Sequence, residues 1–391
     1  MVHNYSELDL MQARIKEVPK GWNFLPIAKA FKIRNDLRKP ISDEIRSTQQ
    51  GTYPYYGPTK IQDYIDAYEQ DGSFALIGED GDHFLKYKSQ SMTQLVDGKC
   101  TVNNHAHIIE GTKTASREWF YYYFMHRDIF SYLSRQGAGR YKLNKASLEK
   151  IYLLIPPSEE QNKIVKILAT WDQAILATER LLENSQLQKK ALMQQLLTGK
   201  KRLLDENGVF FSSKWLTEKL EKICAISTGK KDVNEGNPEG IYPFFTCASE
   251  PTASDNYSYD FEALLIAGNG NLGKTHYING KFEAYQRTYI LSKFNEKVQP
   301  LYLYQYILYW LMRDIEREKQ HGAMPYIKLG LLQNFKIFIP SINEQLKIIE
   351  VLSLADQEIE TLQKKLDCLK QEKKALMQQL LTGKKRVKVA A

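Results

Sequence analysis

Apolar residues recur at alternating spacings of four and three positions along two stretches of about 40 residues, a length of roughly 60 Å if helical. Such a spacing is typical of a coiled-coil seam. In the first stretch the seam consists of Ile164, Leu168, Trp171, Ile175, Leu182, Leu192 and Leu196, with Thr178, Ser185 and Lys189 as polar positions. In the second it consists of Ile348, Leu352, Ala355, Ile359, Leu362, Leu366, Leu369, Leu376 and Leu380, with Lys373 as its polar position.

Helix boundary signals flank both stretches. Ser158 lies three residues before Gln161, and Ser341 lies three residues before Glu344, which is the spacing of a capping box. Neither stretch contains glycine or proline until a closing Thr-Gly pair, whose glycine can adopt a left-handed C-terminal cap. We therefore predict one uninterrupted helix in each stretch.

The two stretches are copies of each other. Residues 189–202 and 373–386 share the sequence KKALMQQLLTGKKR, 184 positions apart. Extended back to Ile155 and Ile339 in the same register, the copies agree at 25 of 48 positions. We predict that the helices pair as an antiparallel coiled coil with a pseudo-twofold axis, because a solitary helix would expose its stripe. The alternative is that each stripe docks on its own globular domain.

The segment before the first helix carries signals for both strands and helix. Short apolar runs at Phe74–Gly78, His83–Lys88 and Thr101–Ile109 are punctuated by Gly and Asp, which predicts strands joined by turns. A helical patch rich in aromatic residues follows at Arg117–Ser134, and Tyr121–Tyr123 within it are expected in the core. The predicted fold class is α+β.

The segment between the helices repeats this plan in a diverged form. The corresponding residues are 53–56 and 242–245, 74–78 and 263–268, 98–99 and 280–281, and 137–141 and 322–326. We predict a tandem repeat of two globular domains, at 1–155 and 203–339, and two helical spacers, at 156–202 and 340–391.

Composition narrows the class of protein only moderately. The net charge of +8 suits an anionic partner but does not identify one. No run approaches 18 apolar residues and the N-terminus lacks the apolar core of a signal peptide, so we expect a cytoplasmic protein without a membrane partner. The four cysteines are scattered without a CxxC pair, which argues against a zinc site or a disulfide framework.

The domain order, the Ile-Pro and Glu-Gln start of each helix and the LLTGKKR end resemble the specificity subunit of type I restriction-modification systems, over residues 18–386. The resemblance implies two target recognition domains, each reading one half of a split, asymmetric site in double-stranded DNA. It implies that the helices set the gap and dock two methyltransferase subunits, which motor and nuclease subunits join. S-adenosylmethionine, ATP and Mg²⁺ would then bind to those partners.

Catalytic and metal-binding patterns are weak in this chain. An amino-methyltransferase needs an Asn/Asp-Pro-Pro-aromatic turn, which is absent. Gly268–Gly273 fits GxGxxG, but the strand-like Lys274–Ile278 that follows favours a hairpin turn facing DNA over a cofactor loop. We expect polar loop and strand end at His105 and His107, and a tight turn at the acidic run 79–82, in preference to metal or nuclease sites.

Base and phosphate contacts must come from polar, basic and aromatic side chains on loops. The candidates in the first domain are Tyr55, Tyr56, Lys60, Lys86, Lys88, Ser89, Gln90, Arg140 and Lys142, and those in the second are Thr246, Ser249, Asn269, Asn271, Lys274, Tyr285, Gln286, Arg287, His321 and Lys328. We expect Arg140 and Arg287 to read guanine edges. The basic groups 200–202 and 384–386 suit helix C-termini and a repeated surface for methyltransferase docking.

A rod of roughly 60 Å would span on the order of 18 base pairs if it lay along the duplex. The sequence therefore predicts a bipartite site whose unread middle depends on helix length. Two other functions remain open: a specificity subunit for a partner that fuses methyltransferase and nuclease, or a DNA-binding protein that acts alone.

Overall fold

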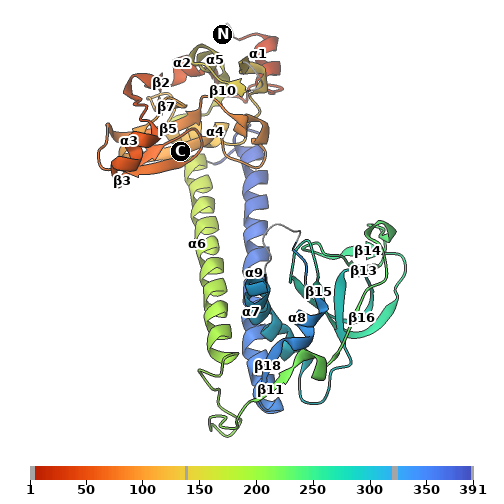
Figure 1. Cartoon of the computed structure of the whole chain (residues 1–391). Helices are drawn as coiled ribbons and strands as arrows, with labels where there is room; N and C mark the ends of the chain where they lie inside the picture. The colour runs from red at the N-terminus through yellow and green to blue at the C-terminus, as the bar shows by residue number, and fades with distance from the viewer. Residues whose placement is uncertain (1–4, 137–139, 319–324, 389–391) are drawn as a thin grey trace. The chain divides into compact units, whose positions relative to one another are not determined.

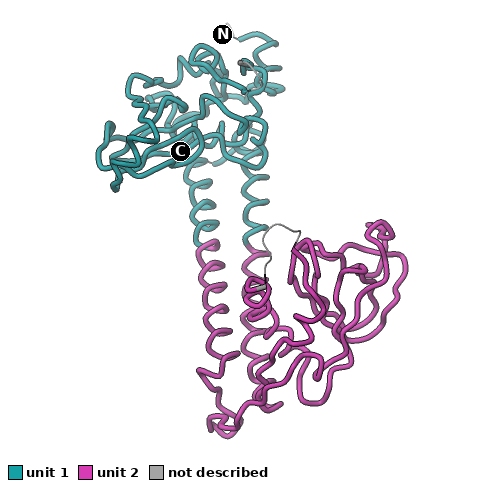
Figure 2. Tube along the Cα trace, in the orientation of Figure 1, with its two compact units in different colours: residues 1–177, 366–391 teal, residues 178–365 magenta. Residues whose placement is uncertain are grey.

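The computed structural model describes residues 5–136, 140–318 and 325–388 and divides the chain into two compact units. Unit 1 comprises residues 1–177 and 366–391, and unit 2 comprises residues 178–365 (Figure 2). Two long helices, α6 (Ser158–Leu196) and α9 (Ile342–Leu380), are labelled in Figure 1, and each contributes residues to both units (Figure 2). Each unit therefore combines a globular domain with part of both helices, which is why unit 1 contains two separate segments.

The globular part of unit 1 mixes short helices with strands. Its elements are α1 (Glu7–Gln12), β1 (Asn23–Pro26), α2 (Ile27–Ala30), β2 (Lys32–Ile33), η1 (Asn35–Leu37), α3 (Asp43–Thr48), β3 (Gln50–Tyr56), β4 (Ile61–Ile65), β5 (Gln70–Gly78), η2 (Asp82–Lys86), β6 (Thr93–Val102), β7 (Ala106–Glu110), α4 (Arg117–Phe124), η3 (Phe130–Tyr132), β8 (Ser134–Gln136), β9 (Arg140–Lys142), α5 (Lys145–Lys150) and β10 (Tyr152–Ile155).

The globular part of unit 2 follows a similar order. Its elements are β11 (Leu216–Lys219), η4 (Leu220–Lys222), β12 (Ala225–Thr228), η5 (Val233–Glu235), β13 (Tyr242–Phe245), β14 (Thr252–Ser254), β15 (Tyr259–Ala267), β16 (Thr275–Ala284), β17 (Thr288–Ser292), α7 (Pro300–Glu318), α8 (Leu329–Asn334) and β18 (Lys336–Ile339).

The two domains share one sheet topology. The six-stranded sheet of unit 1 has the order β2-β7-β5-β6-β3-β4, and that of unit 2 has the order β12-β17-β15-β16-β13-β14. In both sheets the strands at the fourth and fifth positions are parallel, β6 with β3 and β16 with β13, while the other pairs are antiparallel. This supports the sequence correspondence between 53–56 and 242–245, because Tyr56 pairs with Val102 as Phe245 pairs with Ala284.

The central strand of each sheet is covered on both faces, which explains its continuous apolar run. On one face of β5, Ala75 and Ile77 join the core that also contains α4 and the two long helices of unit 1. On the other face, Leu76 belongs to a smaller cluster with Val96 and Ile108. β15 divides its side chains in the same way between two cores.

α6 and α9 pack together in each unit, in agreement with the predicted pairing. Ile164 and Leu168 of α6 share a core with Leu380 of α9 in unit 1, whereas Leu196 of α6 shares a core with Ile348 in unit 2. The start of each helix therefore lies beside the end of the other, so the pairing is antiparallel. All the seam positions predicted from the sequence are buried or half-buried.

The lysines of the seam are paired across the two helices. In unit 2, Lys189 Nζ lies 2.5 Å from Asp356 Oδ1, and in unit 1 Lys373 forms the equivalent pair with Asp172. A polar group in a coiled-coil seam favours the one register that gives it a partner. The duplicated lysine and aspartate thus help to fix the antiparallel alignment.

A duplicated clasp joins the end of each helix to the start of the other. In unit 2, Arg202 donates from Nε and Nη2 to the two carboxylate oxygens of Glu344 at 2.5 and 2.7 Å. Trp215 Nε1 donates to the same carboxylate at 3.1 Å. In unit 1, Arg386 and Trp22 hold Glu160 in the same way, at 2.7, 2.7 and 3.0 Å. This clasp accounts for the duplication of both the Glu-Gln and the LLTGKKR segments.

Gly199 and Gly383, which precede the arginines of the two clasps, have φ of 68° and 69°. This left-handed backbone conformation favours glycine. We expect Gly199→Ala to lower the free energy of unfolding by about 1–2 kcal/mol, the cost of left-handed backbone in a residue with a Cβ. Gly383→Ala should lower it further, because its Cβ would lie 2.4 Å from Cγ of the rigid Pro19 ring, whereas the Cβ at Gly199 would lie 3.5 Å from Trp215. Urea unfolding of both variants measures the difference, and equal losses would contradict it.

Several local predictions were wrong. Residues 83–88 contain the short helix η2 and its following turn instead of a strand, and the run 101–109 is divided by a turn between β6 and β7. The helix predicted at 117–134 ends at Phe124. Ser341 does cap α9, with its hydroxyl accepting from Glu344 N at 3.4 Å, but Ser158 lies inside α6 and is not its cap.

Candidate DNA-binding surface

One edge of the sheet in unit 2 brings together most of the candidates predicted for the second domain. The loop that joins β15 to β16 is fixed to the end of β13, because Asn271 N donates to Cys247 O at 3.0 Å. The same loop is fixed to the β16–β17 turn, since Gly268 N donates to Arg287 O at 2.9 Å. The residues gathered at this edge are Thr246, Ser249, Asn269, Asn271, Lys274, Tyr285, Gln286 and Arg287.

Unit 1 has the same edge, formed by the equivalent connections. Asn103 N donates to Tyr56 O at 3.0 Å, as Tyr285 N donates to Phe245 O at 3.0 Å. Glu79 N donates to His105 O at 2.8 Å, which matches the bond from Gly268 to Arg287. The backbone therefore superposes Asn103, Asn104 and His105 of unit 1 on Tyr285, Gln286 and Arg287 of unit 2, in the register of the strand pairs.

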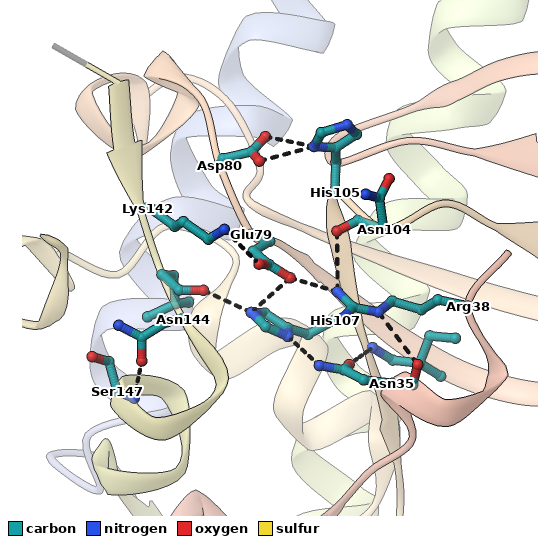
Figure 3. A network of polar contacts seen from close by, with 12 residues as sticks. Asn35, Arg38, Glu79, Asp80, Asn104, His105, His107, Lys142, Asn144 and Ser147 are labelled. Atoms are coloured by element: carbon teal, nitrogen blue, oxygen red, sulfur yellow. Dashed lines mark hydrogen bonds and ion pairs between the residues drawn. The ribbon is translucent and has the colours of Figure 1, made fainter. Parts of the chain in front are cut away.

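A half-buried carboxylate holds this edge together in unit 1 (Figure 3). Glu79 is 13% exposed and accepts from Arg38 Nη1 at 2.5 Å, with Lys142 Nζ at 3.2 Å and His107 Nε2 at 3.8 Å. Arg38 also donates to Asn104 O at 3.1 Å, and Leu143 N donates to Glu79 O at 2.7 Å. We call Glu79, Arg38, His107 and Lys142 the Glu79 clamp. It connects the loop after β5, the β6–β7 turn and β9.

The titration of Glu79 follows from these contacts. Burial raises the pKa of its carboxyl, but the hydrogen bonds from Arg38 and Lys142 and the charge of Arg38 outweigh burial, so the pKa lies below its usual value of 4.5. Burial lowers the pKa of His107 despite its bond to Leu143 O at 2.7 Å, so the imidazole is neutral at pH 7.

We expect Glu79→Gln to lower the free energy of unfolding of unit 1 by about 1–3 kcal/mol, because Arg38 and Lys142 lose their charged partner. A carboxyl whose folded pKa is depressed stabilises the fold above its unfolded pKa and loses this contribution as pH falls through the folded pKa. The wild-type advantage should therefore be complete at pH 7 and shrink below about pH 4.5. Urea unfolding at pH 7 and at pH 3 tests this, and a difference that is independent of pH would contradict it.

Unit 2 has no acidic side chain at the position of Glu79, where Gly268 stands instead. Tyr289 occupies the place of His107 and donates to Ile327 O at 2.8 Å. A cavity of about 350 Å³ opens there, lined by Thr228, Gly268, Gln286, Arg287, Tyr289, Tyr326 and Ile327. No ion-pair partner of the exposed Arg287 guanidinium occurs among the described residues. The same backbone frame thus carries a closed ionic clamp in one domain and an open cationic pocket in the other.

The structure removes some of the predicted contacts. Tyr55 is 2% exposed and its hydroxyl accepts from Ile41 N at 2.9 Å, and Thr246 is 8% exposed, so both side chains are buried where the prediction requires exposure. Tyr56 is half-buried against the second core of unit 1. Lys142 is committed to the Glu79 clamp. Lys88 borders a cavity between α4 and α9.

The remaining candidates are exposed or have no description. Lys60 lies in the β3–β4 turn, Arg140 begins β9, and Lys328 precedes α8, and all three side chains are exposed. Lys86, Ser89 and Gln90 are exposed on η2 and the turn after it. His321 lies outside the described residues.

Sequence reasoning missed Asn104 and His105 as candidate DNA contacts. Both are exposed at the tip of the β6–β7 turn, and His105 Nδ1 lies 2.8 Å from Asp80 Oδ2. The signal is present in the repeat, since an offset of 182 aligns 103–105 with the predicted contacts 285–287, whereas the pattern at His105 and His107 alone predicts only polar loop and strand end. The acidic run 79–82 is predicted as a tight turn, and that prediction does not reveal that Glu79 is largely shielded from solvent and paired with Arg38.

The basic groups at the helix ends divide into two roles. Arg202 and Arg386 bind carboxylates within their own units, and their use as docking residues stays a prediction. The adjacent lysines 200, 201, 384 and 385 are exposed. The described residues contain no cluster of three or more His, Cys, Asp or Glu suited to a metal ion. None of the described helices combines the length and apolar character that a membrane span requires.

Comparison with known proteins gives a consistent family. Residues 19–188 and 212–371 match the type I restriction modification DNA specificity domain. The chain is 28% identical to the putative type I restriction enzyme specificity subunit S.HindORF215P of Haemophilus influenzae, covering 84% of this chain and 86% of that protein. It is 35% identical to the EcoDI specificity subunit of Escherichia coli, over 43% of this chain and 37% of that protein.

A solved structure supports the fold. The type I restriction-modification S subunit of M. genitalium matches with a TM-score of 0.69 at 17% identity, covering 94% of this chain and 97% of that chain. The two matches to the family model cover most of the sequence. Membership of that family also accounts for the duplicated sheet topology and for the pairing of α6 with α9. The chain belongs to the family of type I restriction-modification DNA specificity subunits.

Proposed function

We propose that this chain directs a type I restriction-modification enzyme to a split, asymmetric DNA site. Each globular domain reads one half of that site through the sheet edge described above. α6 and α9 set the unread gap and dock two methyltransferase subunits, which restriction and motor subunits join.

The observation that carries the proposal is that the two domains share the same backbone arrangement at this edge but place different side chains on it. The β6–β7 and β16–β17 turns are held by matching hydrogen bonds. Yet His105 and the Glu79 clamp in unit 1 stand where unit 2 has Arg287 and Gly268. Because hydrogen-bond donors and acceptors at a groove select bases, different side chains at one position imply different half-sites.

The two long helices provide a spacer of defined length and a basic surface that occurs once at the end of each helix. Each has 39 residues, or about 58 Å at about 1.5 Å per residue. The exposed lysines at each helix end occur in both copies, which suits two copies of one partner. S-adenosylmethionine would bind to the methyltransferase partners, and ATP and Mg²⁺ would bind to the motor partners. The chain itself would contribute recognition and no chemistry.

The proposal is tested by mapping methylated adenines across the genome of a host with and without this gene. We expect one motif to disappear with the gene, and to consist of two specified blocks separated by a fixed number of unspecified bases. Co-purification of separate methyltransferase and motor subunits would distinguish this enzyme from a fused methyltransferase-nuclease. Unchanged methylation, together with specific DNA binding by the chain alone, would contradict the proposal and favour a protein that acts alone.

A further inference from the structure

The candidate DNA-binding edge carries an exposed carboxamide at the tip of one turn in both domains, the β6–β7 turn of unit 1 and the β16–β17 turn of unit 2. Asn104 follows Asn103 in the β6–β7 turn, and Gln286 follows Tyr285 in the β16–β17 turn. The matched bonds from Asn103 to Tyr56 O and from Tyr285 to Phe245 O place the two carboxamides at one position of the shared frame. Both residues are exposed.

The turn of Asn104 is held by contacts on both sides of the residue. Arg38, itself fixed by Glu79, donates to the carbonyl oxygen of Asn104. Asn103 Oδ1 accepts from His105 N at 2.8 Å, and the imidazole of His105 is oriented by Asp80. Figure 3 shows the Asn104 carboxamide directed away from Arg38 and toward the side of the turn that carries the His105 ring. No hydrogen bond of this carboxamide occurs within the described chain.

Gln286 is held in a comparable way. Its backbone N–H donates to Lys231 O at 2.9 Å, while its Nε2 makes an exposed bond of 3.4 Å to Asp232 Oδ2. A bond of that length at the surface is readily exchanged for another acceptor. The two turns therefore offer a fixed backbone and a carboxamide available to a partner.

The chemistry of a carboxamide selects among the bases. Its NH₂ group and carbonyl oxygen complement N7 and the N6 amino group of adenine in the major groove, as a bidentate pair. Guanine presents two acceptors at the corresponding edge, and cytosine and thymine lack the paired arrangement. A fixed carboxamide at a reading edge is consequently suited to adenine.

We propose that Asn104 and Gln286 are specificity-determining residues that each read the major-groove edge of one adenine, Asn104 in the half-site of the first domain and Gln286 in the half-site of the second. This inference rests on the proposed function. The neighbouring residues, His105 in one turn and Arg287 in the other, give the two half-sites different adjacent bases. The shared carboxamide gives them one base in common.

The test uses the methyltransferase complex assembled on the full chain. The wild-type motif is mapped first. For each candidate adenine of that motif, methylation rates are then measured on four duplexes, which carry one of the four base pairs at that position and are otherwise identical. We expect Asn104→Ala to reduce the preference for adenine at one position of one half-site by on the order of ten- to a hundredfold. Gln286→Ala should do the same in the other half-site only. Asn23→Ala, at an exposed asparagine of β1, is the matched control and should leave both half-sites unchanged.

Each outcome decides the question. Unchanged preferences, a loss at a base other than adenine, or an equal loss of rate on all four duplexes would overturn the inference. Thermal unfolding of each complex establishes that a change in preference occurs in folded protein. If the wild-type complex methylates no split motif, the proposed function fails instead, and the two failures are thereby distinguished.

Discussion

Arg202→Ala is expected to lower the free energy of unfolding of unit 2 by about 3–5 kcal/mol. Glu344 is 1% exposed at its side chain and receives two hydrogen bonds from Arg202 and one from Trp215. Without the guanidinium, a buried carboxylate is left with a single neutral donor, and the stacking of Arg202 over Trp215 is lost. Urea unfolding gives the loss, and hydrogen exchange at β11 and β18 assigns it to unit 2.

The exposed neighbour of Arg202 provides a matched control. Lys201→Ala removes one positive charge from the same helix end and should change stability by less than about 0.5 kcal/mol. The double variant Arg202→Met with Glu344→Leu should recover most of the loss, because replacing both members of a buried pair is far less costly than removing one. A loss for Arg202→Ala no larger than that for Lys201→Ala would contradict the clasp.

Inserting four residues into α6 and four at the facing level of α9 is expected to lengthen the unread gap while leaving both half-sites unchanged. Four helical residues add about 6 Å, which corresponds to about two base pairs. The two insertions are placed opposite each other in the helix pair, between the two clasps. Both ion pairs are then preserved, because Arg202 and Glu344 lie in one unit and Arg386 and Glu160 in the other. Mapping methylated adenines in cells that carry the variant gives the new motif.

The control for this experiment is the same insertion outside the helices. Placed after Asn207, in the exposed turn where Gly208 N donates to Asp205 O, it should leave the gap unchanged. An insertion in the helices that alters the specified bases, or leaves the gap as it was, would show that helix length does not set the gap.

Much of the fold could be predicted from the sequence because its strongest signals are long and repeated. The 4,3 spacing extends over many turns, so single polar positions such as Lys189 and Lys373 do not obscure it. The identical ends of the helices indicated an antiparallel pairing, although only the structure revealed why the arginine and glutamate are duplicated. They bind each other across the helix pair, at a separation in sequence that no local pattern reports.

The candidate DNA-binding edge was only partly predictable. Short apolar runs are compatible with strand or helix, so His83 and Phe84, which are buried on η2, were assigned to a strand. Tyr55 is predicted as a base contact because aromatic residues are common at nucleic-acid surfaces, but it is 2% exposed and its hydroxyl is bonded to Ile41 N. The Glu79 clamp draws residues from four separate segments, and sequence alone does not indicate which charges meet.

The central claim is that each domain reads its own half of the site. The most direct test replaces residues 215–339 with residues 22–155, so that Trp22 takes the place of Trp215 beside Glu344 and the first domain occurs twice. We predict a methylation motif in which the first half-site appears twice as an inverted repeat, across the wild-type gap. A motif that retains the second half-site, or that contains the first half-site only once, would contradict the account.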